Sequence, residues 1–198
     1  MHDKKFDPAN KERLDSPDRK KYLDPDDIAE QLGVRGGMRV ADVGAGTGFF
    51  SIPLAGLAGG TVKVYALDIS TEMLDMLRKK ARGMDNIEYV LTKEDAIQLD
   101  EGLVDLAIMI NVFHELEGDG TLREVLRILK PGGRLAIADW AKRPMMQGPP
   151  YGHRISEDAA VERVTGAGFE FHDWFVPGPY HYGLIFSKPA EITRTTRR

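Results

Sequence analysis

Acidic and amide side chains stand at the ends of successive apolar stretches in the first 139 residues of this chain. The set is Asp42, Asp68, Asp95, Asn111 and Asp139. Carboxylate and amide oxygens accept hydrogen bonds from hydroxyl, amino and ammonium groups. If the apolar stretches are strands of one parallel sheet, these groups converge at one edge and can line a site for a polar organic ligand.

Three glycines at alternate positions, Gly44, Gly46 and Gly48, separate the apolar run 38–43 from a helical pattern. Glycine accepts positive φ and has no Cβ, so the backbone of such a turn can approach a ligand closely. The N–H groups at the start of the following helix favour a carboxylate or a phosphate. An ordinary strand-to-helix turn without a ligand is the alternative, but it does not need the entropic cost of three glycines.

The elements that must position these groups alternate between strand and helix. Extended patterns cover 38–43, 61–67, 87–91, 103–112 and 135–138, with helical patterns between them. This alternation predicts an α/β fold: a doubly wound, Rossmann-like parallel sheet with right-handed crossovers that binds ligands at the carboxyl ends of its strands.

The last third of the chain follows a different pattern. Ser156-Glu157-Asp158 begins a helix that runs to Gly166. Two aromatic-rich strands follow, 169–176 and 180–187. Because only Pro177-Gly178-Pro179 joins them, we expect them to form an antiparallel hairpin.

Local signals place several helix ends. Asp24 before Pro25, and Ser70 before a helical apolar face, are expected N-caps. Pro53 lies early in the helix after the glycines, where its missing N–H costs little. Lys130-Pro131-Gly132-Gly133 is expected to end the helix that precedes the strand 135–138.

Composition bounds the class of protein. The 198 residues carry a net charge of −4 and contain no cysteine. The charge argues against nucleic acid as the main partner. The missing cysteines exclude disulfides, cysteine-ligated metals and thiol nucleophiles, and we expect no metal site. Neither a signal peptide nor a membrane-spanning run is visible, so we expect a cytoplasmic protein without a membrane partner.

The length suits one domain with short extensions. We assign 24–188 to the domain, 1–23 to an N-terminal arm and 189–198 to a flexible basic tail. The arm is either ordered over a pocket or a solvated tail. The oligomeric state is left open.

A glycine loop with an acid after the next strand suits a dinucleotide, but it also suits another ligand that contains a nucleoside. A dinucleotide-binding fold usually carries G-x-G-x-x-G, whereas this chain has G-x-G-x-G with Phe49 where the third glycine would stand. Asp68, twenty residues beyond Gly48, can accept hydrogen bonds from both ribose hydroxyls. Both ligands use such an acid, so Asp68 does not distinguish them.

The chain resembles the class I S-adenosylmethionine-dependent methyltransferases over residues 24–188. The resemblance is carried by Val40-Ala41-Asp42-Val43-Gly44-Ala45-Gly46-Thr47-Gly48, Tyr65-Ala66-Leu67-Asp68-Ile69, Asp95-Ala96 and Leu129-Lys130-Pro131-Gly132-Gly133. It implies seven strands in the order 3-2-1-4-5-7-6, with strand 7 antiparallel. Within the class, the chain is most similar to the quinone-biosynthesis C-methyltransferases.

The resemblance also implies roles for individual residues toward S-adenosylmethionine. The backbone of Gly44 and Gly46, in the loop that ends at Gly48, lies against the methionine part. Asp42 and the Asn111 carbonyl serve its ammonium, and Asp68 holds the ribose. The adenine is contacted by Ile69, Met73, Asp95 and the N–H of Ala96; core packing is the alternative for Met73. Tyr22 closes over the cofactor.

Candidates for the chemistry lie at the same edge. His114 is the expected catalytic base, since histidine titrates near neutral pH; the alternative is a histidine satisfied by backbone at a helix start. Asp139 and Trp140 are expected to line the acceptor site. Arg154, after a Pro/Gly-rich loop, binds an acidic substrate or is merely solvated.

Three functions therefore compete. The first is methyl transfer to a small-molecule acceptor, since no large recognition domain is present in these 198 residues. The second is a nicotinamide-dependent oxidoreductase. The third is a non-catalytic S-adenosylmethionine-binding module.

Overall fold

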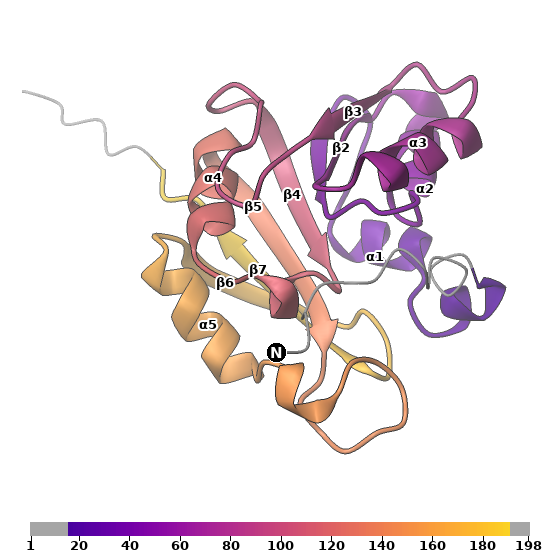
Figure 1. Ribbon diagram of the computed structural model, residues 1–198. Helices are drawn as coiled ribbons and strands as arrows, with labels where there is room; N and C mark the ends of the chain where they lie inside the picture. Colours follow the sequence, from indigo (N-terminus) through magenta and orange to yellow (C-terminus); the bar gives the residue numbers. More distant parts are fainter. Residues whose placement is uncertain (1–15, 191–198) are drawn as a thin grey trace, which may run out of the picture.

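The computed structural model describes residues 16–190, which form a seven-stranded sheet in the order β3-β2-β1-β4-β5-β7-β6 (Figure 1). Neighbouring strands are parallel except at β7, which is antiparallel to both β5 and β6. This confirms the predicted sheet and strand order. The elements are η2 (Pro17–Lys21), α1 (Pro25–Gln31), β1 (Arg39–Val43), α2 (Ser51–Gly56), η3 (Leu57–Gly60), β2 (Lys63–Asp68), α3 (Thr71–Lys80), β3 (Ile87–Leu91), β4 (Val104–Ile110), η4 (Phe113–Glu115), α4 (Gly120–Ile128), β5 (Leu129–Trp140), η5 (Tyr151–His153), α5 (Glu157–Gly166), β6 (Glu170–Phe175) and β7 (His181–Ser187).

Helices cover both faces of the sheet, and each face has its own apolar core (Figure 1). One core joins the sheet to α1, α2 and α3 through residues such as Ile28, Leu54 and Leu77. The other joins it to α4 and α5 through Leu122 and Val164. The central strand β4 is buried on both sides along nearly its whole length, as its continuous apolar sequence predicts.

Helix starts follow the predicted capping residues. The side chains of Asp24, Ser70 and Ser156 accept hydrogen bonds from the first-turn N–H groups of α1, α3 and α5. Pro53 is the third residue of α2, in the first turn as expected.

The predicted boundary of the fifth strand was wrong. Instead of 135–138, β5 begins at Leu129 directly after α4 and runs to Trp140. Leu129 pairs with Val104, and pairing then resumes irregularly at Arg134 with Leu106. The Pro-Gly-Gly segment between them interrupts the ladder rather than preceding it, because proline has no N–H and Gly132 has φ +73°.

The described part of the N-terminal arm is attached to the domain. η2 leads to Leu23, which is fully buried in the core with α1. Residues 1–15 of the expected arm and 191–198 of the expected tail lie outside the described residues. Among residues 16–190, no helix is long and apolar enough to cross a membrane.

Candidate active site

The glycine loop follows β1 at the carboxyl edge of the sheet, where the backbone is held by β2. The N–H groups of Gly44 and Ala45 both donate to the Leu67 carbonyl, at 2.8 and 2.9 Å. Gly44 has φ +74°, and a Cβ at this position would overlap the Val112 side chain. The loop therefore requires glycine at Gly44 and presents exposed backbone there.

Two carboxylates flank this loop. Asp42 is buried and accepts a hydrogen bond of 2.6 Å from the Ser51 hydroxyl. Burial raises the pKa of Asp42 from 3.8 to about 6. The hydrogen bond from Ser51 lowers this pKa, and the negative charge of Asp68 raises it further. Asp68 accepts bonds of 2.8 Å from the N–H groups of Gly46 and Ser70. Burial raises the pKa of Asp68 as well, while these N–H bonds oppose the shift.

The residues expected around an adenine differ in exposure. Ile69, directly after Asp68, is 50% exposed, whereas Met73 in the first turn of α3 is 5% exposed. Asp95 is exposed in a tight turn closed by two bonds between Lys93 and Ala96. In that turn the Ala96 N–H already donates to the Lys93 carbonyl at 3.3 Å.

Asn111 turns the chain out of β4 with φ +60°, a conformation that asparagine tolerates better than most residues. Its N–H donates to the Ala138 carbonyl of β5 at 2.8 Å. Its side-chain oxygen is buried and has no hydrogen-bond partner among residues 16–190. Such an unsatisfied acceptor costs free energy unless a ligand or water completes it.

His114 and Asp139 form a buried pair at the ends of adjacent strands. The Nδ1 of His114 lies 2.8 Å from Oδ1 of Asp139, and the His114 N–H donates to Oδ2 at 2.9 Å. The Trp140 N–H also donates to Asp139, at 2.7 Å. Because an ionised carboxylate only accepts hydrogen bonds, the contact with Asp139 favours the tautomer of His114 that carries its proton on Nδ1. Nε2 lies 3.8 Å from Oε1 of Glu115.

His114 and Asp139 were predicted as separate site residues, and their pairing was not predicted. The available signal was that both residues were expected near the carboxyl ends of two strands that are neighbours in the implied strand order. Val112, which packs against Gly44, precedes His114 by two residues. The pair therefore lies close to the glycine loop.

An aromatic cluster borders the site beyond β5. The Trp140 and His181 rings are 4.3 Å apart, and Tyr22 lies near both and near Tyr180. Within the described part of the chain, both ring nitrogens of His181 lack hydrogen-bond partners. Burial lowers the pKa of His181 to about 4, so its ring is neutral at pH 7. Tyr22 thus contacts residues on the expected acceptor side of the site.

Both predictions for Arg154 were wrong, because its side chain is neither solvated nor available to a substrate. Its buried guanidinium donates to the carbonyls of the loop before it. The acceptors are Ala141, Arg143, Met145, Pro149 and Gln147, at 2.7 to 3.5 Å. The side chain holds the loop together, a role that its sequence position did not reveal.

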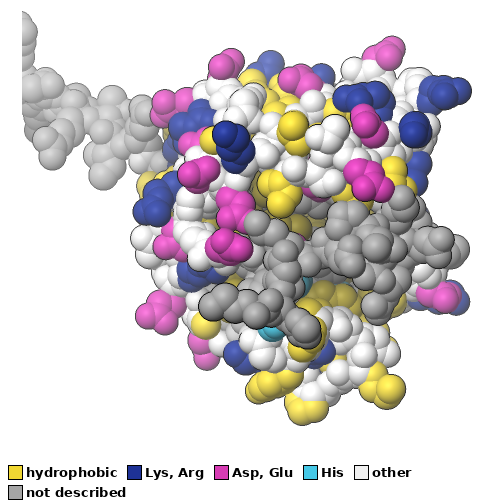
Figure 2. All heavy atoms as spheres, in the orientation of Figure 1, with side chains coloured by type: hydrophobic (Ala, Val, Ile, Leu, Met, Phe, Trp, Pro, Cys, Tyr) yellow, Lys and Arg dark blue, Asp and Glu magenta, His cyan; other side chains and the backbone are white. Residues whose placement is uncertain are grey.

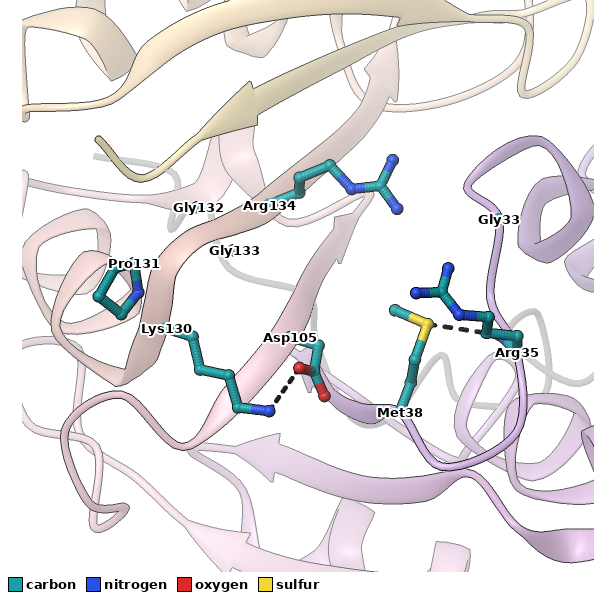
Figure 3. A pocket seen from close by; sticks show the side chains of 9 residues that line it. All are labelled: Gly33, Arg35, Met38, Asp105, Lys130, Pro131, Gly132, Gly133 and Arg134. Carbon is teal, nitrogen blue, oxygen red and sulfur yellow. Dashed lines mark hydrogen bonds and ion pairs between the residues drawn. The ribbon is translucent and has the colours of Figure 1, made fainter. Parts of the chain in front are cut away.

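A crevice of about 520 Å³ lies elsewhere, at the amino edge of the sheet (Figure 3). Arg35 and Arg134 line it, and Lys130 is paired with Asp105 within it. It is on the opposite edge of the sheet from the glycine loop and does not belong to the candidate site. Among the described residues, no group of three or more His, Asp or Glu side chains could hold a metal ion.

Comparison with known proteins identifies the family of this chain. A family model described as "Methyltransferase domain" matches residues 41–137. A solved S-adenosylmethionine-dependent methyltransferase from Aquifex aeolicus is 34% identical, with a TM-score of 0.88 over 92% of this chain and 99% of that chain. This chain belongs to the S-adenosylmethionine-dependent methyltransferases. Its cofactor is therefore S-adenosylmethionine, and the nicotinamide alternative is excluded.

One similar protein has an assigned reaction. The ubiquinone/menaquinone biosynthesis C-methyltransferase UbiE of Escherichia coli (strain K12 / DH10B) is 36% identical over 156 residues. The match covers 71% of this chain but only 62% of that relative. The [4+2]-cyclase SpnF matches at 22% identity with a TM-score of 0.70 over 84% of this chain and 80% of its own, which shows a shared fold alone.

Proposed function

We propose that this methyltransferase methylates a small molecule, a carbon atom on a quinone-related ring, with His114 as the base. The observation that carries the proposal is the buried contact of 2.8 Å between His114 Nδ1 and Asp139. A histidine oriented by a carboxylate at the carboxyl edge of the sheet is an arrangement suited to proton removal. The name of the relative UbiE supports the class of acceptor.

The residues around the glycine loop fit the cofactor. The Gly44 backbone is exposed where a Cβ would not fit. The Asp42 carboxylate is buried; the charge of Arg19 acts on it, but no cation among the described residues is hydrogen-bonded to it. Asn111 adds an unsatisfied acceptor nearby. A ligand that brings an ammonium group would compensate the buried charge of Asp42.

We infer the following assignment of residues to the cofactor. Asp42 and the Asn111 carbonyl hold the ammonium, and the backbone of the loop from Gly44 to Gly48, Gly46 included, lies along the methionine part. Asp68 keeps acceptor capacity for the ribose beyond its two N–H bonds. The exposed Ile69 offers its side chain to the adenine face, and Asp95 its carboxylate to the adenine edge. The burial of Met73 favours core packing as its main role.

When bound, S-adenosylmethionine supplies a methyl group on a positively charged sulfur. The protein orients the acceptor against that methyl group, which is worth up to about 7–11 kcal/mol. His114 Nε2 takes the proton that the acceptor loses as the new bond forms. Asp139 holds the ring in the required tautomer and stabilises the resulting imidazolium. The paired rings of Trp140 and His181 form the border of the acceptor space on the side of β7.

The test is methyl transfer from tritiated S-adenosylmethionine to 1,4-naphthohydroquinone, together with cofactor binding by calorimetry. His114→Gln and Asp139→Asn should each lower kcat by about 10²–10⁴-fold and leave cofactor affinity unchanged. His172→Gln, at an exposed histidine of β6, is the matched control.

Two outcomes oppose the proposal. Full activity of both variants would show that no base at His114 is needed. Tight cofactor binding with no transfer to the quinol or to an extract of small metabolites would support the binding-module alternative.

A further inference from the structure

The loop between β5 and α5, residues 141–155, projects apolar side chains into solvent. Met146 is 99% exposed and Tyr151 is 55% exposed. Pro144 and Pro150 are exposed as well. This loop is drawn in orange at the lower end of Figure 1, and hydrophobic side chains gather at the same end in Figure 2. Exposed apolar side chains that gather in one patch, unlike single scattered ones, are typical of interaction surfaces.

The loop is held in one shape, although it contains no strand or long helix. The guanidinium of Arg154 donates to five loop carbonyls, among them those of Arg143, Gln147 and Pro149 at 2.7 to 2.9 Å. Gly148, with φ +84°, packs directly against the Trp140 ring. The base of the loop is therefore anchored on its inner side, and Met146 is left on the outer side.

The charges of the loop have one sign. Residues 140–156 contain Lys142, Arg143 and Arg154 and no acidic residue. The Lys142 amine lies 5.8 Å from the centre of the Tyr151 ring. The flanking acids are Asp139, which is buried, and Glu157, which begins α5.

The neighbouring hairpin turn extends the uncharged surface. The Ala141 N–H donates to the Tyr180 carbonyl at 2.9 Å, and the Arg143 guanidinium donates to the Pro179 carbonyl. The turn 176–180, Val-Pro-Gly-Pro-Tyr, contains no charged side chain. Loop and turn together form an apolar tip with cations at its base.

We propose that the loop 141–155 docks on an anionic lipid bilayer. Met146 and Tyr151 enter the boundary between headgroups and acyl chains, while Lys142 and Arg143 contact lipid phosphates. Aromatic and basic residues favour this interface, and cations near an anionic surface strengthen binding. The sequence predicted no membrane partner because no spanning run is visible, but peripheral docking requires no such run.

A bilayer suits this tip better than a protein partner. A stable protein interface buries about 800 Å² on each side with matched shape. A few protruding side chains on a convex loop offer much less, whereas lipid adapts to them. The loop follows Trp140 directly, so docking would place the aromatic border of the site near the membrane surface. The proposal stands independently of the acceptor and of the catalytic role of His114.

The experiment is co-sedimentation of the full chain with vesicles of phosphatidylcholine alone or with phosphatidylglycerol, without cofactor. We expect binding to the anionic vesicles that weakens as salt is raised. Met146→Glu should lower the partition coefficient at least about tenfold, since it removes the largest apolar insertion. Leu91→Glu, an equally apolar-to-acid change at an exposed residue of the far edge strand β3, should bind like the wild type.

Several results would overturn the proposal. They are no binding of the wild type to anionic vesicles, equal binding of the two variants, or a wild-type dimer that Met146→Glu dissociates in light scattering. Because Met146 is almost fully exposed, its variant should unfold at the wild-type temperature. Methyl transfer to soluble naphthohydroquinone, measured without vesicles, is expected to be unchanged in Met146→Glu, so a failure of docking and a failure of the proposed chemistry are distinguishable.

Discussion

Replacing Asp42 by asparagine tests whether burial of the ionised Asp42 carboxylate destabilises the cofactor-free domain. Asp42 is buried beside the glycine loop and bonded to Ser51. An asparagine of nearly equal size keeps an oxygen for the Ser51 hydroxyl but carries no charge. The substitution therefore removes the burial penalty of the charge and leaves the packing in place.

The magnitude follows from the pKa. Burial raises the pKa of Asp42 from 3.8 to about 6. At about 1.36 kcal/mol for each pKa unit, ionised Asp42 destabilises the cofactor-free fold at pH 7 by about 3 kcal/mol relative to its protonated form. Because its pKa is raised in the folded state, Asp42 contributes to the stability of the fold while it is protonated. This contribution is fully present below pH 3.8 and is lost as the pH rises through about 6. The Asp42→Asn variant lacks this loss.

The assay is urea unfolding of both proteins at a series of pH values from 4 to 7.5, without cofactor. The stability of Asp42→Asn relative to wild type should rise by about 2 kcal/mol between pH 4 and pH 7. Any constant cost of the new amide cancels in this comparison. Asp105→Asn is a control of opposite sign. Burial raises the pKa of Asp105, but the bonds from Lys130 and the Arg39 N–H outweigh it and lower the pKa, so that variant should lose relative stability as the pH rises.

The affinity of Asp42→Asn for S-adenosylmethionine is a second measurement on the same variant. Asp42→Asn should weaken S-adenosylmethionine binding by about 10–100-fold, the value of a charge-assisted hydrogen bond to an ammonium. Parallel pH profiles of wild type and variant would refute the reasoning about burial. Unchanged cofactor affinity would refute the role of Asp42 toward the ammonium.

Two further predictions concern the backbone around the site. Gly44→Ala should lower the free energy of unfolding by at least about 2 kcal/mol, because φ is +74° and the new Cβ overlaps a side chain. Gly56→Ala, where a Cβ meets no described atom within 4 Å, should be neutral or stabilising in the same urea experiment. Arg154→Lys should speed tryptic cleavage at Lys142, because one ammonium cannot replace a guanidinium that donates to five carbonyls. Arg123→Lys, at an exposed arginine, should leave that cleavage rate unchanged.

Much of the fold was predictable because its signals are local or periodic. The alternation of strand and helix patterns, the caps at Asp24 and Ser70 and the short hairpin turn each depend on residues close in sequence. The start of β5 was missed for the same reason. Pro131 and the following glycines suggest a helix end and a loop, but pairing of Leu129 with Val104 draws the chain into the sheet earlier. Such pairing comes from a distant strand and leaves no local mark.

The sequence by itself determined the sheet, the glycine loop and the identity of the acids that surround it, because parallel strands bring their carboxyl ends to one edge whatever the details of packing. Only the tertiary structure decided what those side chains do with one another. Side-chain direction and burial depend on the whole fold. The pairing of His114 with Asp139, the burial of Met73 and the enclosure of the Arg154 guanidinium by loop carbonyls therefore became visible only when the chain was folded.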